Sequence, residues 1–138
     1  MGRILGIDFG EKRIGLALSD GLGITAQGLE TCKNEPNLFS HLKKLIQEYA
    51  IEKIVVGIPR DQKGRIDRHL PVIDFIAVLK EELNLPVETW DERLTTSEAE
   101  RVLLSADISR RKRKKVRDKL SAQIILQSYL DYNSNIKN

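Results

Sequence analysis

The most constraining feature of this sequence is a pair of short apolar runs, separated by only a few residues, near its start. The first run, residues 3–10, reads Arg-Ile-Leu-Gly-Ile-Asp-Phe-Gly, with apolar side chains on both faces of a strand. The second runs from Ile14 to Leu18. So short a connection predicts antiparallel neighbours, with Gly10 allowing the chain to reverse. Asp8 then ends a central strand, where a lone carboxylate is costly, so we expect a basic group, backbone donors or a metal ion beside it.

The remaining chain alternates between strands and helices. The patterns predict a third antiparallel strand over residues 24–32, a helix opening at Pro36, a buried strand over 54–58, a helix over about 72–83, a strand over 87–91, a helix started by the capping pair Thr95 and Glu98, and a long helix over about 110–132. This order indicates one α/β domain, residues 1–138, with a mixed sheet and helices on its faces.

Composition narrows the setting of the chain. Cys32 is the one cysteine of the sequence, which excludes an internal disulfide and fits a reducing cytoplasm. No apolar run approaches the roughly 20 residues of a membrane span, and the N-terminus has no signal-peptide pattern. We therefore expect a cytoplasmic protein without a membrane partner, and an inert Cys32 because no base lies near it in the sequence.

The charge is concentrated in one segment. The formal net charge is +3, but residues 110–119 alone carry +7, so the remainder carries −4. The segment contains a continuous basic run: Arg110, Arg111, Lys112, Arg113, Lys114 and Lys115. Such a run indicates a polyanionic partner, and the alternative is a solvated helix face.

Four acidic residues are candidates for chemistry. Asp8 and Asp91 both end apolar strands, and ligands of open α/β sheets bind beyond the carboxyl ends of strands. Glu92 faces the other way from Asp91 if the strand continues, and the sequence leaves open which of the two turns inward. Asp118 shares a helical face with Ala122, which predicts that it points to the sheet; the alternative is an ion pair on the helix surface.

Converging carboxylates would need a cation, because like charges raise one another's pKa. Oxygen ligands suit Mg²⁺ or Mn²⁺. His41 and His69 lack the spacing of a zinc site, and the sequence contains neither a Ser-His-Asp set nor a phosphate-binding glycine loop.

With these residues in place, the sequence resembles one family, the pre-16S rRNA nucleases, also described as Holliday-junction-resolvase-like (YqgF, RuvX). The matching stretches are residues 6–10, 13–17 with 19–20, 56–59, 91–96 (Asp-Glu-Arg-Leu-Thr-Thr), and Asp118 followed by residues 121–122 and 125–127. They occur in the family's order and cover nearly the whole chain. Two positions depart: the loop at residues 61–64 reads Asp-Gln-Lys-Gly where Asn-Met-Asp-Gly is usual, and Ser121 replaces a common alanine.

The resemblance implies an RNase H-like fold with strand order 3-2-1-4-5 and a metal-dependent phosphodiesterase site. Its catalytic residues would be Asp8, Asp91, Glu92 and Asp118, with Asp8, Asp91 and Asp118 as ligands of two Mg²⁺ or Mn²⁺ ions. It implies trimming of the 5′ end of precursor 16S rRNA, with cleavage of branched DNA junctions as the alternative. A monomer and a homodimer both stay open.

Two arginines flank the acids. Arg13 and Arg93 could bind phosphates or orient the carboxylates by ion pairing. Two other classes of function compete with a nuclease. One is a catalytically silent nucleic-acid-binding module; the other is an actin-like phosphate-binding half-domain, which the lack of an internal repeat disfavours.

Overall fold

A computed structural model describes residues 2–94 and 110–137, and the side chains of residues 2–93 and 120–134. The elements are β1 (Arg3–Asp8), β2 (Arg13–Ser19), β3 (Ala26–Lys33), α1 (Leu38–Tyr49), β4 (Ile51–Ile58), α2 (Pro71–Leu83), β5 (Val87–Asp91), the 3₁₀ turn η1 (Glu92–Leu94) and α4 (Arg110–Lys137).

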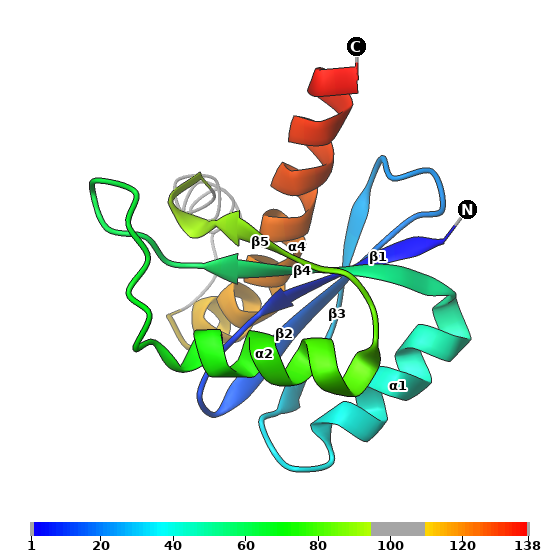
Figure 1. The fold of residues 1–138 in the computed structure, drawn as a ribbon, viewed down its shortest axis with the longest axis horizontal. Coiled ribbons are helices and arrows are strands. Elements are labelled where there is room, and N and C mark those ends of the chain that lie inside the picture. Colours follow the sequence, from blue (N-terminus) through cyan, green and yellow to red (C-terminus); the bar gives the residue numbers. More distant parts are fainter. Residues whose placement is uncertain (1, 95–109, 138) are drawn as a thin grey trace.

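The five strands form one mixed sheet in the order β3-β2-β1-β4-β5. β1, β2 and β3 are antiparallel neighbours, and β4 and β5 run parallel to β1. Helices α1 and α2 cover one face of the sheet, and α4 crosses the other (Figure 1). The fold class and strand order expected from the sequence are therefore observed.

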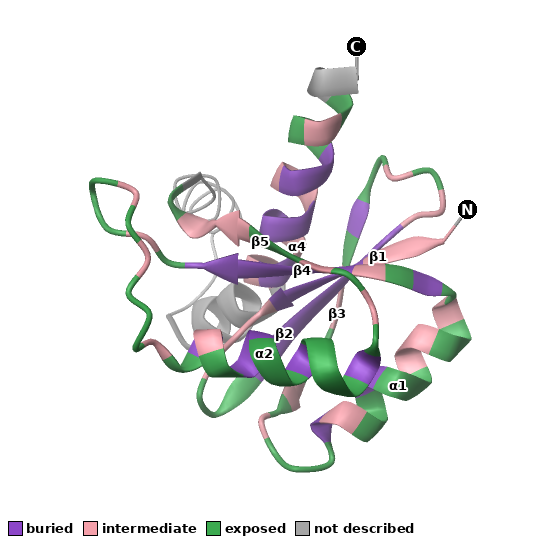
Figure 2. Ribbon diagram, viewed as in Figure 1, coloured by how far each residue is buried: buried purple, intermediate pink, exposed green. Residues whose placement is uncertain are grey.

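Alternation along the strands divides the core into two layers, and the central strands are buried from both sides (Figure 2). Leu5 and Ile7 of β1 face α1 and α2 in the larger layer. The alternate residues of β1 face α4, where Gly6 lies against Ala122 and Leu126. Each fully buried Leu or Ile contributes about 1.5–3 kcal/mol, so the two layers together account for the position of the helices.

Polar contacts fix the direction in which α4 crosses the sheet. The Tyr129 hydroxyl donates to Glu88 Oε2 at 2.5 Å and accepts from Lys53 Nζ at 3.1 Å, near the starts of β5 and β4. Gln127 bonds the backbone of Ala26, the first residue of β3. The C-terminal half of α4 therefore lies at the edge where these strands begin. Its N-terminal half extends toward the edge where β1, β4 and β5 end.

Several expected boundaries were wrong. The strand expected over residues 54–58 begins at Ile51, and the strand expected over residues 24–32 begins at Ala26. The first helix begins at Leu38 rather than at Pro36, because Pro36 lies in a turn in which the Leu38 N–H donates to the Glu35 carbonyl at 2.9 Å. The last helix continues past Tyr132 to Lys137, since no glycine or proline stops it. The helix expected from Thr95 lies outside the described residues. Within the described part of the chain, no helix combines the length and apolar character of a membrane span.

Candidate active site

The candidate site lies where β1, β4 and β5 end. Asp8 is the last residue of β1 and, two residues beyond Gly6, lies on the α4 face. β1 and β4 are paired in parallel up to Ile7 and Val56, so Asp8 and Gly57 come next in the two strands. The strand order β3-β2-β1-β4-β5 reverses between β1 and β4, so the site is at the point where the strand order switches. Ligands of open α/β sheets bind at such a point.

Glu92, in η1, reaches Asp8 across β4. Gly57 makes this possible, because a Cβ at that position would lie 3.0 Å from Glu92 Oε1. A side-chain hydrogen bond joins Glu92 to Asp8. Burial raises the pKa of Glu92, the charge of Asp91 raises it further, and the hydrogen bond with Asp8 opposes both. Two carboxyl groups hydrogen-bond each other only when one holds a proton, so the pair is a place where a cation can replace a proton.

Asp91 has different partners. The Arg93 side chain donates to it through Nε at 3.0 Å and Nη2 at 2.6 Å, and the Arg93 N–H donates at 3.0 Å. Arg60 Nε lies 4.0 Å away. The hydrogen bond from the Arg93 side chain is the main cause that lowers the pKa of Asp91. The structure thus brings Glu92, rather than Asp91, into contact with Asp8.

Arg93 also holds the loop after β4. Its Nη1 donates to the Asp61 carbonyl at 3.0 Å, and Arg60 Nη1 donates to the Gly64 carbonyl at 2.9 Å. Gly64 has φ +81°, the left-handed conformation that favours glycine. Asp91, Arg93 and Arg60 therefore form a clamp, which we call the arginine clamp, that attaches loop 60–65 to the end of β5.

The structure describes the backbone position of Asp118 in α4. Ala122 lies over Gly6, and Ile125 lies over Gly57. Asp118 is one helical turn before Ala122, on the side of the strand ends that carry Asp8 and Glu92. Its side chain lies outside the described part, as do those of the basic run Arg110–Lys115, which forms the first turns of α4. Among the described side chains, no three His, Cys, Asp or Glu residues are grouped so that they could hold a metal ion.

A cavity of about 260 Å³ opens beside the two carboxylates. The cavity lies between the turn after β1 and the start of α2. Its lining comprises Asp8, Phe9, Gly10, Glu11, Gly57, Pro59, Leu70, Pro71, Val72 and Glu92. None of these ten residues is basic, so the cavity combines the carboxylates of Asp8, Glu11 and Glu92 with an apolar wall.

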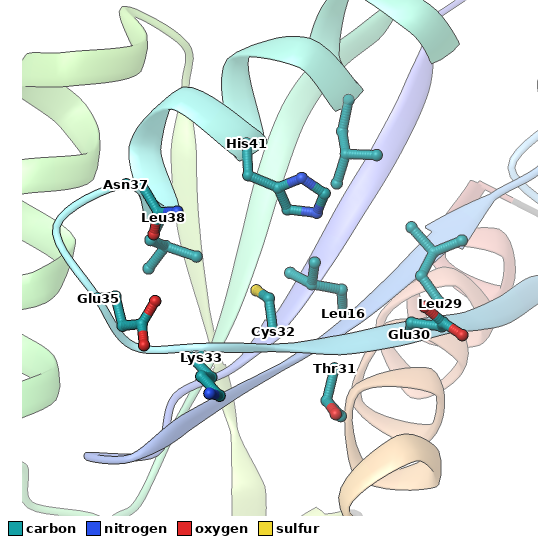
Figure 3. A pocket seen from close by; sticks show the side chains of 11 residues that line it. Leu16, Leu29, Glu30, Thr31, Cys32, Lys33, Glu35, Asn37, Leu38 and His41 are labelled. Atoms are coloured by element: carbon teal, nitrogen blue, oxygen red, sulfur yellow. The ribbon is translucent and has the colours of Figure 1, made fainter.

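Other titratable residues lie elsewhere. Cys32 and His41 line a separate hollow of about 460 Å³ between β3 and α1, with the Cys32 sulfur directed toward the helix (Figure 3). Burial raises the pKa of the Cys32 thiol, which makes it a poor nucleophile. His69 is exposed in the loop before α2. None of the three lines the cavity that holds Asp8 and Glu92.

Comparison with known proteins decides the family. The family described as "RuvX: Holliday junction resolvase" matches residues 2–132. The chain belongs to the RuvX family. Curated relatives named "Putative pre-16S rRNA nuclease" include proteins of Desulfitobacterium hafniense, 49% identical over 94% of this chain and 92% of the relative. Others are from Halothermothrix orenii, 49% identical over 97% and 98%, and Listeria monocytogenes, 50% identical over 94% and 97%.

Solved structures agree on the fold. Thermus thermophilus RuvC in complex with a Holliday junction superposes with a TM-score of 0.55 at 16% identity, covering 97% of this chain and 96% of RuvC. Fowlpox virus resolvase with Holliday junction DNA gives 0.54 at 14% identity, covering 99% of both chains. The RuvX chain has the RNase H-like fold of these resolvases. As a member of this family it is a nuclease, a hydrolase of phosphodiester bonds whose substrate is nucleic acid.

The sequence analysis did not identify Gly57 or Arg60 as parts of the site. A signal for Gly57 was available, because a glycine inside the β-branched strand β4 is typical of a position that another group approaches closely. Arg60 had no comparable signal. Its role depends on loop 60–65 folding back onto β5, which only the tertiary structure shows.

Proposed function

We propose that this RuvX protein is a divalent-metal-dependent nuclease that removes the 5′ extension of precursor 16S rRNA, with Asp8, Glu92 and Asp118 holding the metal. The observation that supports it most is the contact between Asp8 and Glu92 in a cavity at the strand ends. The names of relatives 49–50% identical over nearly their full length support the rRNA substrate.

The donor set fits a hard cation. Both described carboxylates offer only oxygen, which suits Mg²⁺ or Mn²⁺ rather than zinc. Burial of Glu92 makes its charged form unfavourable without a counter-charge, as its raised pKa indicates. When bound, such ions polarise the scissile phosphate and activate a water molecule. Asp118 supplies the third carboxylate in this proposal, because it precedes Ala122, which lies against Gly6 of β1, by one turn of α4.

Asp91 has a positioning role in this proposal. Its carboxylate is occupied by Arg93 and faces Arg60, so it holds η1 and loop 60–65 in place beside Glu92. The alternative, Asp91 as a metal ligand, requires it to leave the arginine clamp. Arg93 correspondingly orients Asp91, and phosphate binding falls to Arg13, at the exposed start of β2, and to the basic run Arg110–Lys115.

The test is cleavage of a labelled precursor fragment containing the 5′ extension, with Mg²⁺, Mn²⁺ or chelator. Asp8→Asn and Glu92→Gln should abolish metal-dependent cleavage, because each amide keeps the shape but loses the ligand charge. Asp91→Asn should reduce cleavage less than either. Glu30→Gln, at an exposed position of β3, is the matched control and should retain full activity. Undiminished cleavage by Asp8→Asn would refute the site.

A second candidate is resolution of branched DNA, which the family description "Holliday junction resolvase" favours. A four-way junction assayed beside the precursor RNA separates the two. If the four-way junction is cleaved faster than the precursor RNA, branched DNA replaces precursor rRNA as the proposed substrate. The proposal that the carboxylates form the catalytic site is not affected by that result.

A further inference from the structure

We propose that the cavity beside Asp8 and Glu92 is a subsite for one unpaired nucleobase, next to the phosphodiester bond that is cleaved. This inference rests on the proposed function, since it takes the two carboxylates as the catalytic centre. It adds a substrate requirement: the nucleotide adjacent to the cleaved bond must be free of its complementary strand.

The chemistry of the lining favours a base over a phosphate. The ten lining residues include no lysine or arginine, and their three acidic residues would repel a phosphate inside the cavity. The basic side chains lie instead in the neighbouring hollow of about 450 Å³, which is lined by Arg60 and Arg65. A nucleobase has a flat apolar face that suits the apolar wall of the cavity.

Exposed apolar side chains form that wall. Pro59 and Pro71 are exposed and Leu70 is half-buried, although each lines the cavity. Phe9 also lines the cavity and is half-buried, with its ring centroid 4.8 Å from that of Phe75. The two exposed prolines do not belong to the core, so their apolar surface is available to a ligand.

The position of the cavity connects it to the chemistry. Asp8 and Glu92 belong to the same lining as Pro59 and Pro71, so a nucleotide whose phosphate reaches the carboxylates can place its base against the prolines. Pro59 and Leu70 also line the adjacent hollow that holds Arg60 and Arg65, which continues the path for the strand. A base still paired in a duplex could not enter a cavity of about 260 Å³ beside the sheet.

The experiment uses fluorescently labelled single-stranded RNA pentamers in which an abasic ribose replaces one nucleotide at a time. Binding is measured by anisotropy in chelator, and cleavage with Mg²⁺. In the wild type, one position should lose affinity on the order of tenfold, as expected for one lost stacking contact. In the double variant Pro59→Ser/Pro71→Ser the intact pentamer should bind more weakly, and the abasic penalty at that position should largely disappear. Pro36→Ser, another exposed proline before a helix, is the control and should keep the wild-type pattern.

The outcomes separate the subsite from the proposed function. Cleavage without any position-specific abasic penalty, or an equal penalty in the wild type and the double variant, would overturn the subsite and leave the nuclease assignment intact. A position-specific penalty in chelator that the double variant removes would support the subsite even if no metal restored cleavage. In that case the proposed nuclease function would be refuted, and the nucleobase subsite would be retained.

Discussion

Gly6 and Gly57 should respond differently to alanine substitution, although both lie under α4. A Cβ at Gly6 would lie 2.8 Å from Leu126 Cβ and 3.3 Å from the Ala122 carbonyl oxygen. Both contacts belong to parts of α4 that move only with the helix. Since an ordinary contact needs 3.4 Å, the helix must shift by about half an ångström.

At Gly57 the contacts are softer. A Cβ there would lie 2.5 Å from Ile125 Cδ1 and 3.0 Å from Glu92 Oε1, both at the ends of rotatable side chains. Relief therefore comes from side-chain rotation, and Glu92 is displaced from Asp8 as a result. We expect a small loss of stability but a large loss of metal-dependent cleavage.

The magnitudes follow from the contacts. Overpacking lowers the free energy of unfolding by about 1–3 kcal/mol. Replacing glycine by alanine also reduces the conformational entropy of the unfolded chain, which raises the free energy of unfolding by about 0.4–1 kcal/mol. We expect Gly6→Ala to lower the free energy of unfolding by about 1–2 kcal/mol, or Tm by roughly 3–10 °C. Gly57→Ala should cost less than about 1 kcal/mol, because its neighbours can rotate.

Urea unfolding in chelator, followed by circular dichroism, measures stability, and the RNA assay measures activity. Ile125→Val removes Cδ1, so Gly57→Ala should cost less in that background than in the wild type, with a coupling of roughly 0.5 kcal/mol or more. A larger loss of stability in Gly57→Ala than in Gly6→Ala, or full additivity with Ile125→Val, would refute the packing argument.

Three further predictions concern charge. The pKa of Glu92 is raised in the folded state, so the metal-free protein should lose stability as the pH rises from about 4.5 through the folded pKa of Glu92. At pH 7, Glu92→Gln should therefore unfold at a higher urea concentration than the wild type. Below about pH 4.5 this difference should disappear. The pKa of Asp91 is lowered, so its stabilisation is present above about pH 3.8 and is lost as pH falls through its folded pKa. Arg93→Gln should weaken this acid dependence and increase proteolysis within loop 60–65, whereas Arg68→Gln should change neither. Changing the four basic residues 110, 111, 113 and 114 to glutamine should reduce the slope of log affinity against log salt by about three. Equal slopes in the wild type and the variant would refute nucleic-acid binding by this run and favour the alternative of a solvated helix face.

The architecture could be predicted from local patterns. The pair of apolar runs around Gly10 predicted the antiparallel start of the sheet, and alternation with amphipathic helices predicted the parallel strands that follow. The strand order and the RNase H-like fold came from the resemblance, and the structure and the family confirm them. The start of α1 was missed because proline favours the first turn of a helix and also the turn before it.

The candidate site was only partly predictable. Asp8 and Glu92 were both candidates, but the choice between Asp91 and Glu92 depends on which face a side chain takes after the strand ends, and periodicity does not define that. The assignment of Asp118 as a ligand stays a prediction. An ion pair between Arg93 and a neighbouring carboxylate was one of the two roles expected for Arg93, and the structure shows it with Asp91. The contribution of Arg60 was not predictable, because Arg60 comes from a separate segment.

By itself, the sequence determined the order and type of elements, since these depend on the periodicity of neighbouring residues. It also determined the chemistry available: carboxylates at strand ends and one basic segment. Only the tertiary structure decided that Glu92 meets Asp8, because that contact needs β4 between them to present Gly57, a position without a side chain. Contacts across three strands depend on register and on empty space, and neither is encoded in a local pattern of residues.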